Sequence, residues 1–260
     1  MNELKLICTG DIFLQTKNGL NPFQNIKEVF FGDVLLFGNL ESALSNKGKP
    51  IEKRVLIKMN PSKVDHLTNA GFDIVNIANN HIMDYGKIGL RDTIDILDKK
   101  NIKFIGAGKN INDAVNPVIF QRNGFKIGFI GFTEIGIMAT ENRDGCAPLN
   151  KELLLTLLPK LRKEVDILII SLHWGVEYVF YPSPNQQKIA RFLIDNGADL
   201  VIGHHPHVIQ GIEKYKNKFI FYSLGNCNFG TEQDKNYNGT NVGVILSIKF
   251  SKKIIKEKRI

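Results

Sequence analysis

Histidine occurs in this sequence mainly in short blocks that follow apolar runs. Five of the six histidines lie in three such blocks, which are Asn79-Asn80-His81, Ser171 to Gly175 and Gly203 to His207. Gly10-Asp11 and Asn39-Leu40-Glu41 bring carboxylates to the same kind of position. Nitrogen and oxygen donors without cysteine suit Mn²⁺, Zn²⁺ or Fe²⁺ better than a soft ion. The blocks therefore predict a centre for one or two divalent ions, an arrangement suited to hydrolysis.

The two acidic candidates each have a structural alternative. Asp11 follows the first apolar run, so it lies where a chain leaves a sheet edge, but an aspartate there can also serve a turn or cap a helix. Glu41 ends the apolar run that starts at Leu35, and a carboxylate beside a buried strand needs either a cation or a solvated edge.

The next two blocks supply amide and imidazole donors. Asn80 and His81 close the apolar segment that starts at Ile74, and the alternative to a site there is a capped loop that includes Asp84. His173 follows a long apolar run, and taken singly it can be a hydrogen-bonded core histidine. Asn80, His81 and His173 are therefore candidate donors, each with a structural alternative.

The strongest local signal is His205-Pro206-His207. Alternate residues of an extended segment face the same side, so the two imidazoles can reach one cluster of ions. Pro206 also biases His205 toward an extended backbone. His204 would then point elsewhere, and we expect it to support the site rather than to bind metal.

Apolar runs alternate with helical patterns along the chain, which predicts an α/β fold with a mixed sheet or two packed sheets. The expected strands are 4–8, 34–37, 72–77, 104–105, 127–132, 167–171, 200–202 and 219–222, and the expected helices are 61–70, 86–100, 151–163 and 185–196. The segments 208–212, 219–224 and 242–250 lack long helices between them, which favours antiparallel pairing there. We expect a single domain over residues 1–260 that ends in a basic tail at 251–260.

Charge and composition narrow the function classes. The net charge of +8 is spread over the chain except in the tail, so no basic strip for nucleic acid is expected. No apolar run is long enough for a membrane helix, and the start of the chain lacks a secretory signal, which predicts a cytoplasmic protein without a membrane anchor. The three cysteines form neither a disulfide framework nor a thiolate metal site.

The order of the blocks resembles the CapA family, also called the poly-γ-glutamate capsule synthesis (PGA_cap) family, a branch of the calcineurin-like metallophosphatases. The blocks that carry the resemblance are Gly10-Asp11, Asn39 to Ser42, Ala78 to His81 with Asp84 to Gly86, Ser171 to Tyr178, Gly203 to Val208 and Tyr222 to Asn226. The resemblance implies a four-layer α-β-β-α sandwich of two mixed sheets flanked by helices.

The resemblance also implies roles for individual residues. The metal ligands would be Asp11, Glu41, Asn80, His173, His205 and His207, with Glu41 as the bridging acid. His81 matches a histidine near the leaving group that does not bind metal. Asn39, His204 and Asn226 would support the ligands through hydrogen bonds, while Trp174, Tyr178 and Tyr181 either line a substrate entrance or simply pack beneath a loop.

The sequence departs from the superfamily pattern at Phe13. The superfamily's opening motif is Asp-x-His, and the third position here is phenylalanine, so a ligand to one ion is missing. The bridging acid is also Glu41 rather than aspartate. The number of bound ions is therefore open between one and two.

Three functions compete at this point. The leading hypothesis is hydrolysis of a small-molecule or polymer phosphoester by a metal-activated hydroxide, with His81 as proton donor or charge stabiliser. The second is a non-hydrolytic accessory role in capsule or poly-γ-glutamate synthesis, with other capsule-synthesis proteins as partners. A nuclease is third, disfavoured by the diffuse positive charge.

Overall fold

The apolar runs of the sequence form two six-stranded sheets in the computed structural model, which describes residues 2–14, 20–229 and 237–252. The first sheet has the order β15-β1-β2-β5-β6, with β16 also paired to β1; its strands are β1 (Asn2–Ile12), β2 (Val34–Leu40), β5 (Ile74–Asn76), β6 (Lys103–Ile105), β15 (Asn226–Asn228) and β16 (Leu246–Lys252). The second sheet has the order β13-β14-β12-β11-β9-β8; its strands are β8 (Val118–Arg122), β9 (Phe125–Thr133), β11 (Ile167–His173), β12 (Leu200–His204), β13 (Ile212–Tyr215) and β14 (Lys218–Phe221).

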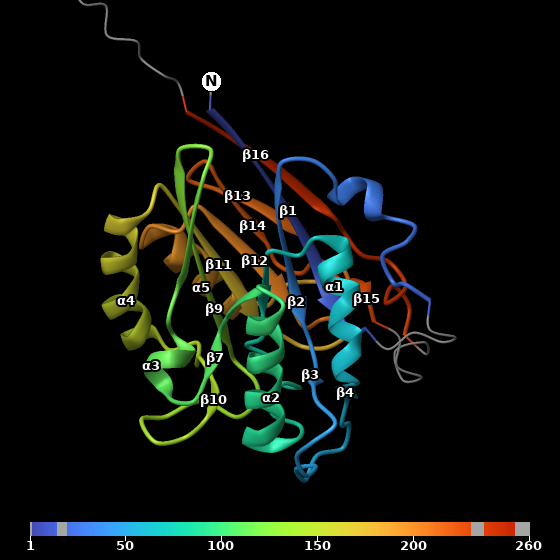
Figure 1. Ribbon diagram of the computed structural model, residues 1–260. Coiled ribbons are helices and arrows are strands. Elements are labelled where there is room, and N and C mark those ends of the chain that lie inside the picture. The colour runs from blue at the N-terminus through green and yellow to red at the C-terminus, as the bar shows by residue number, and fades with distance from the viewer. Residues whose placement is uncertain (1, 15–19, 230–236, 253–260) are drawn as a thin grey trace, which may run out of the picture.

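Five α-helices and two small ladders complete the described chain. The helices are α1 (Val64–Ala70), α2 (Gly86–Lys99), α3 (Ile111–Ala114), α4 (Lys151–Glu164) and α5 (Pro184–Asp195), with 3₁₀ turns η2 (Lys27–Phe30) and η3 (Pro61–Lys63). The ladders pair β3 (Ala43–Leu44) with β4 (Lys58–Met59), and β7 (Ala107–Gly108) with β10 (Gly145–Cys146). Figure 1 shows α4 and α1 on opposite sides of the strands.

Side-chain alternation divides the core into three clusters. In β1 and β2, Leu6 and Phe37 face the second sheet, whereas Ile7 and Leu36 belong to the cluster beneath α1 and α2. The central strands of the second sheet are also buried on both faces, because Ile169 joins the cluster between the sheets and its neighbour Ile170 packs toward α4 and α5. Strands covered on both faces read as continuous apolar runs rather than as alternating patterns. The predicted four-layer sandwich with two mixed sheets is confirmed.

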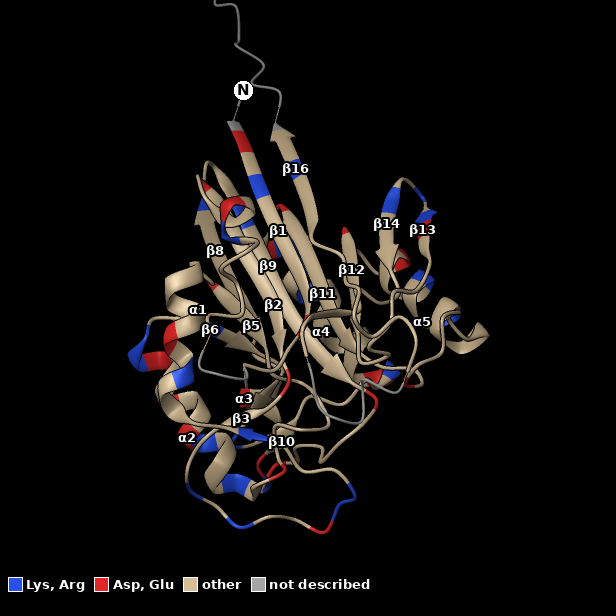
Figure 2. Ribbon diagram, turned by 90° about the vertical axis from the view of Figure 1, so that its right-hand side faces the viewer, with Lys and Arg blue, Asp and Glu red and all other residues tan. Residues whose placement is uncertain are grey.

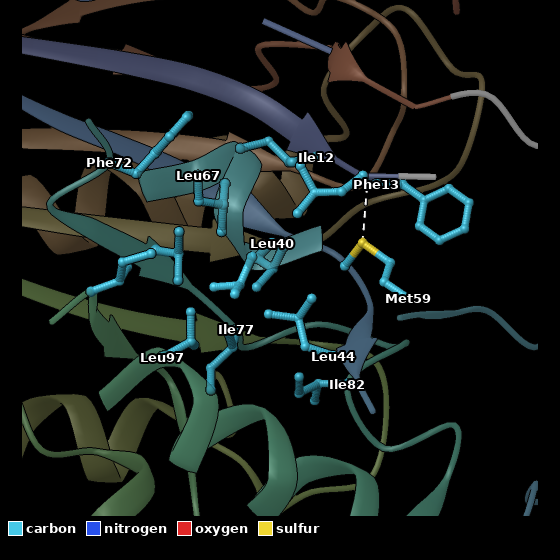
Figure 3. Packing of buried hydrophobic residues seen from close by; sticks show 14 of the residues in the cluster. Ile12, Phe13, Leu40, Leu44, Met59, Leu67, Phe72, Ile77, Ile82 and Leu97 are labelled. Carbon is cyan, nitrogen blue, oxygen red and sulfur yellow. Dashed lines mark hydrogen bonds between the residues drawn. The ribbon is translucent and has the colours of Figure 1, made fainter. Parts of the chain in front are cut away.

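The cluster beneath α1 and α2 also holds the segment that leads from β1 toward the site. Figure 3 shows Ile12, Leu40 and Leu44 within this cluster, and its dashed line marks the hydrogen bond that the Leu14 amide donates to Met59 Sδ at 2.9 Å. The ends of β1 and β2 are therefore fixed by packing as well as by strand pairing.

Helix boundaries follow the capping chemistry of the sequence. Asn60 accepts a hydrogen bond from the Ser62 amide at the start of η3, and Ser183 forms a capping box with Gln186 at the start of α5. Three of the four predicted helices therefore begin within one residue of their expected positions, whereas α1 begins at Val64, because residues 61–63 form the 3₁₀ turn η3.

The C-terminal third pairs largely as expected, with corrections. β13 and β14 form an antiparallel hairpin and β16 is antiparallel to β1, but β14 is parallel to β12 and β15 is parallel to β1. Residues 208–211 are not a strand, because β13 begins at Ile212. The predicted tail begins inside β16, which runs to Lys252, and residues 253–260 lie outside the described residues.

Two further expectations concern charge and membranes. Figure 2 shows Lys and Arg scattered over many of the visible elements, in keeping with a diffuse positive charge. No helix within the described ranges is long and apolar enough to cross a membrane.

A close backbone approach beside β1 requires glycine. The Asp11 amide donates to the Gly225 carbonyl at 2.9 Å, and a Cβ built on Gly10 would lie 1.8 Å from that same carbonyl oxygen. We predict that Gly10→Ala lowers the free energy of unfolding by about 2 kcal/mol or more, because the strand must move away from residues 224–226. Chemical denaturation measures this change.

Gly211→Ala is the matched control, because a Cβ at Gly211 meets nothing within 4 Å. Its stability should be unchanged or slightly raised. Equal stability of the two variants would contradict the close approach at Gly10.

Candidate metal centre

The candidate residues gather where parallel strands of both sheets end. Asp11 lies near the end of β1, Glu41 directly follows β2, His173 is the last residue of β11, and His205 directly follows β12. These four side chains are buried, with exposures of 0% for Asp11, Glu41 and His173 and 4% for His205. The carboxyl ends of parallel strands are the usual place for sites in α/β proteins.

Asp11 is held by residues distant in sequence rather than by a local turn. Its Oδ1 accepts from Asn39 Nδ2 at 2.8 Å and lies 3.3 Å from His204 Nδ1, while its Oδ2 accepts from the His205 amide at 3.2 Å. Burial alone would raise the pKa of Asp11, but hydrogen bonding from His204 and the charges of His207 and His204 outweigh burial and lower that pKa. Asp11 is therefore an anion in the interior.

Asn39 connects most of the site. Its amide nitrogen lies 3.5 Å from Glu41 Oε2 and 3.3 Å from His173 Nδ1, in addition to its bond with Asp11. Its carbonyl oxygen accepts from Asn76 Nδ2 at 2.9 Å, which fixes the orientation of the amide. The side chain of Asn39 thus lies behind the acidic residues, as a support.

Two groups of donor atoms share Glu41. One group is Glu41, His173 and His205, and the other is Asp11, Glu41 and His207; within each group the donor atoms lie within 4.8 Å of one another. Asn80 Oδ1 lies 2.9 Å from His173 Nε2, so its carbonyl oxygen extends the first group. Each group could hold one ion, with Glu41 between them.

The donors fit a divalent cation. Burial, reinforced by the charge of His207, lowers the pKa of His205 to about 3, and burial lowers that of His173 well below its usual range. Both rings are therefore neutral near pH 7 and offer a lone pair. His205 Nδ1 is also buried without a hydrogen-bond partner among the described residues, and a cation would compensate the buried carboxylates.

The expectation of an extended His205-Pro206-His207 segment is wrong. His205 has φ 99° and His207 has φ 57°, both unusual for residues with a side chain. The chain bends because the His205 amide donates to Asp11 while the Pro206 carbonyl accepts from the Tyr178 amide at 2.8 Å. The two imidazoles nevertheless come together, with ring centroids 6.0 Å apart.

His204 and Asn226 lie behind the candidate ligands. His204 is the last residue of β12, is fully buried beside Asp11, and packs against Phe37 with ring centroids 6.0 Å apart. Asn226 Oδ1 lies 2.9 Å from His207 Nδ1, so a proton on that nitrogen leaves Nε2, 3.7 Å from Glu41, as the donor for metal.

Phe13 occupies the position at which the resemblance led us to look for histidine. Its ring is 7% exposed and packs against Phe229, with centroids 5.6 Å apart, and Phe229 in turn packs against His207 at 4.4 Å. Phe13 and Phe229 thus form an aromatic wall beside the donor group of Asp11, Glu41 and His207. This group has three donors.

His81 lies beside the candidate ligands and faces a pocket of about 230 Å³. Its Nδ1 is 2.6 Å from Asp84 Oδ2, and Lys53 Nζ lies 3.1 Å from the same nitrogen and 2.9 Å from Asp84 Oδ1. The carboxylate of Asp84 orients the ring so that Nε2 is available for a ligand. Asn79 provides the capped turn considered above, because its Oδ1 accepts from the amides of His81 and Ile82.

The aromatic residues after β11 differ in position. Trp174 is fully buried, donates its indole N–H to the Tyr222 carbonyl at 3.0 Å and belongs to the core beneath α5, so it packs and does not line an entrance. Tyr178 lines the pocket beside His207. Tyr181 is 83% exposed and is not among the pocket-lining residues.

Sequence reasoning missed three charged residues of the pocket, which are Lys53, Arg54 and Glu177. Lys53 lies in the loop that precedes β4, and Glu177 forms a third donor group with His205 and His207. Glu177 could have been found, because it lies four residues after His173 within the segment Ser171 to Tyr178 that carries the resemblance. Nothing in the local sequence distinguishes Lys53 from the other lysines.

Comparison with known proteins adds to this geometry. The family described as bacterial capsule synthesis protein PGA_cap matches residues 5–231, a range that contains every candidate residue from Asp11 to Asn226. The chain belongs to this family.

Two relatives have names that refer to the biosynthesis of PGA or of a capsule. The chain is 36% identical over 221 residues to the PGA biosynthesis protein CapA of Bacillus subtilis (strain 168), an alignment that covers 83% of the chain and 58% of that protein. It is 37% identical over 246 residues to the capsule biosynthesis protein CapA of Bacillus anthracis, covering 87% and 60% respectively. The chain thus spans less than two thirds of the length of these relatives.

A solved structure resembles the fold. The protein TT1561 of Thermus thermophilus aligns with a TM-score of 0.50 and 15% identity over 86% of this chain and 90% of the other. At this identity the likeness concerns the fold alone.

Two donor groups contain Glu41, and we call them the inner groups: one is Glu41, His173 and His205, and the other is Asp11, Glu41 and His207. Loss of the Glu41 carboxylate should therefore weaken metal binding by both inner groups. We predict that Glu41→Gln lowers the affinity for Mn²⁺ at every position by about 10- to 100-fold or more, whereas Asp11→Asn and His173→Ala each weaken one position. Isothermal titration and metal analysis of the purified variants measure affinity and stoichiometry. Wild-type stoichiometry and affinity in Glu41→Gln would contradict a shared ligand.

Proposed function

We propose that this PGA_cap protein acts in the synthesis of a capsular polymer, for which the name of its Bacillus subtilis relative gives PGA as an example, and that the action depends on divalent metal. The observation that carries the proposal is the family match over residues 5–231, which includes the whole candidate centre. Mn²⁺, Zn²⁺ and Fe²⁺ are the proposed ions, one or two per chain. Other capsule-synthesis proteins are the proposed partners.

The names of the relatives support this role more strongly than they support hydrolysis. A protein of Mycobacterium tuberculosis (strain ATCC 25618 / H37Rv), described as a probable polyglutamine synthesis accessory protein, is 30% identical over 209 residues. Lys53 and Arg54 line the pocket beside the centre, and their positive charge suits an anionic polymer or ester.

A chimera tests the capsule role. We predict that the Bacillus subtilis relative keeps polymer synthesis when its matched segment, 58% of its length, is replaced by this chain. The readout is polymer yield in a strain that lacks the relative. Yield at the level of the deletion strain, despite normal expression of the chimera, would contradict the proposal.

The same chimera with Glu41→Gln separates the metal centre from the scaffold. Loss of polymer in this variant alone supports metal dependence, and unchanged yield would contradict it.

Phosphoester hydrolysis is the second candidate function. The observation that favours it is the position of His81, which is buried between Asp84 and Lys53, adjacent to Asn80, and lines the pocket. Bound metal ions would neutralise phosphoryl charge and lower the pKa of water. Asp84 would orient the imidazole, and His81 would donate a proton to the leaving oxygen or stabilise charge on it.

Replacement of His81 tests this role. We predict that His81→Ala lowers turnover of a responsive mono- or diester by about 10²- to 10⁴-fold while metal binding is kept, because the imidazole acts on the leaving group. Assays of an ester panel with added Mn²⁺, Zn²⁺ or Fe²⁺ measure turnover. His66→Ala is the control, since His66 lies on α1 outside the blocks.

The assay also separates the two candidate functions. Metal binding without turnover on any ester favours the capsule role alone. Unchanged turnover in His81→Ala would remove His81 from the chemistry.

A further inference from the structure

Glu177 brings a third carboxylate to the pocket side of the candidate centre. One carboxylate oxygen of Glu177, one ring nitrogen of His205 and one ring nitrogen of His207 lie within 4.8 Å of one another. The residue is half-buried and lines the pocket of about 230 Å³, whereas Asp11 and Glu41 are fully buried. An ion held by Glu177 would therefore lie closer to solvent than one held by the two inner groups.

The loop that carries Glu177 is fixed to the histidine segment by backbone contacts. The Trp174 amide donates to the His204 carbonyl at 3.1 Å, and the Tyr178 amide donates to the Pro206 carbonyl at 2.8 Å. Gln210 Nε2 donates to the Val179 carbonyl at 2.7 Å, on the far side of Glu177. Contacts on both sides of Glu177 thus hold its backbone beside the two imidazoles.

Within the part of the chain that the structure describes, no side-chain cation is paired with the charge of Glu177. Lys53, which lines the same pocket, is paired with Asp84 at 2.9 Å. His205 Nδ1 likewise has no hydrogen-bond partner in the described part of the chain. A carboxylate and two imidazoles in this arrangement offer the donor types that Mn²⁺ and Zn²⁺ take.

We propose that Glu177 is a further ligand of the metal centre, which binds a divalent cation together with His205 and His207 on the pocket side. The inference rests on the proposed metal centre. His205 belongs to one inner group and His207 to the other, so the group that contains Glu177 adjoins both. Its oxygen supplies a donor in a centre where Phe13 cannot supply one.

The test compares Glu177→Gln with the wild-type chain. Both are stripped of metal with a chelator and titrated with Mn²⁺, with free Mn²⁺ followed by electron paramagnetic resonance. We predict that Glu177→Gln loses at least about 10-fold in affinity for one or more Mn²⁺ ions, because a neutral amide is a weaker ligand than a carboxylate. Glu177→Asp should fall between the two.

Glu141→Gln is the matched control, because it removes the same charge from an exposed position outside the pocket. Thermal unfolding of the metal-free proteins should give the same midpoint for all variants, which excludes misfolding as the cause of weaker binding. A smaller rise in the midpoint on addition of Mn²⁺ is then expected only for the Glu177 variants.

The outcomes separate this inference from the proposed centre. Wild-type affinity and stoichiometry in Glu177→Gln, with Mn²⁺ still bound, would overturn the role of Glu177 and leave the centre in place. Absence of Mn²⁺ binding in the wild-type chain would overturn both. An equal loss of affinity in Glu141→Gln would show a general charge effect and would also overturn the role of Glu177.

Discussion

Two carboxylates buried between two sheets are the constraint on which the site depends. Removing an ionised carboxylate from water costs several kcal/mol even after the protein relaxes, so Asp11 and Glu41 need compensating partners. Asp11 receives hydrogen bonds from Asn39 and from the His205 amide, and His204 lies beside it. Among the described residues, no Lys or Arg is paired with Asp11, so these partners satisfy its lone pairs without a permanent positive charge. A divalent cation would supply the missing charge, and the clustered histidines would then serve as its ligands.

The two-sheet packing is what brings these partners together. Asn39 on β2 contacts Asp11 on β1 within the first sheet and His173 on β11 in the second. The cluster between the sheets, which includes Leu6, Phe37 and Ile169, holds the strand ends at this separation. A loss of packing there would separate the donors even if every ligand residue were kept. The core therefore contributes to the chemistry by fixing the distances between the donor atoms, although its residues do not contact a ligand.

Sequence reasoning succeeded where burial is continuous and failed where long-range contacts decide. Strands buried on both faces, such as β1 and β11, were visible as apolar runs, and Asn60 marked a helix start through its local capping chemistry. The two-residue ladders β3–β4 and β7–β10 carry too little pattern to detect. The bend at His205 was also missed, because it results from a hydrogen bond with Asp11, 194 positions away in the sequence. Lys53 was missed for the same reason, since its partner Asp84 lies in another loop.

Phe13 is fixed beside the site by its backbone as well as by its ring. The Phe13 amide donates to the Asn228 carbonyl at 2.6 Å, and Asn228 Nδ2 donates to the Phe13 carbonyl at the same distance, so both backbone groups of Phe13 are used in pairing with the β15 segment. The ring packs against Phe229, which also covers His207. A histidine at position 13 would put a polar ring against this apolar wall and would need a partner there. The lost donor and the aromatic wall thus belong to one arrangement, in which any replacement donor must approach from the pocket side of His207.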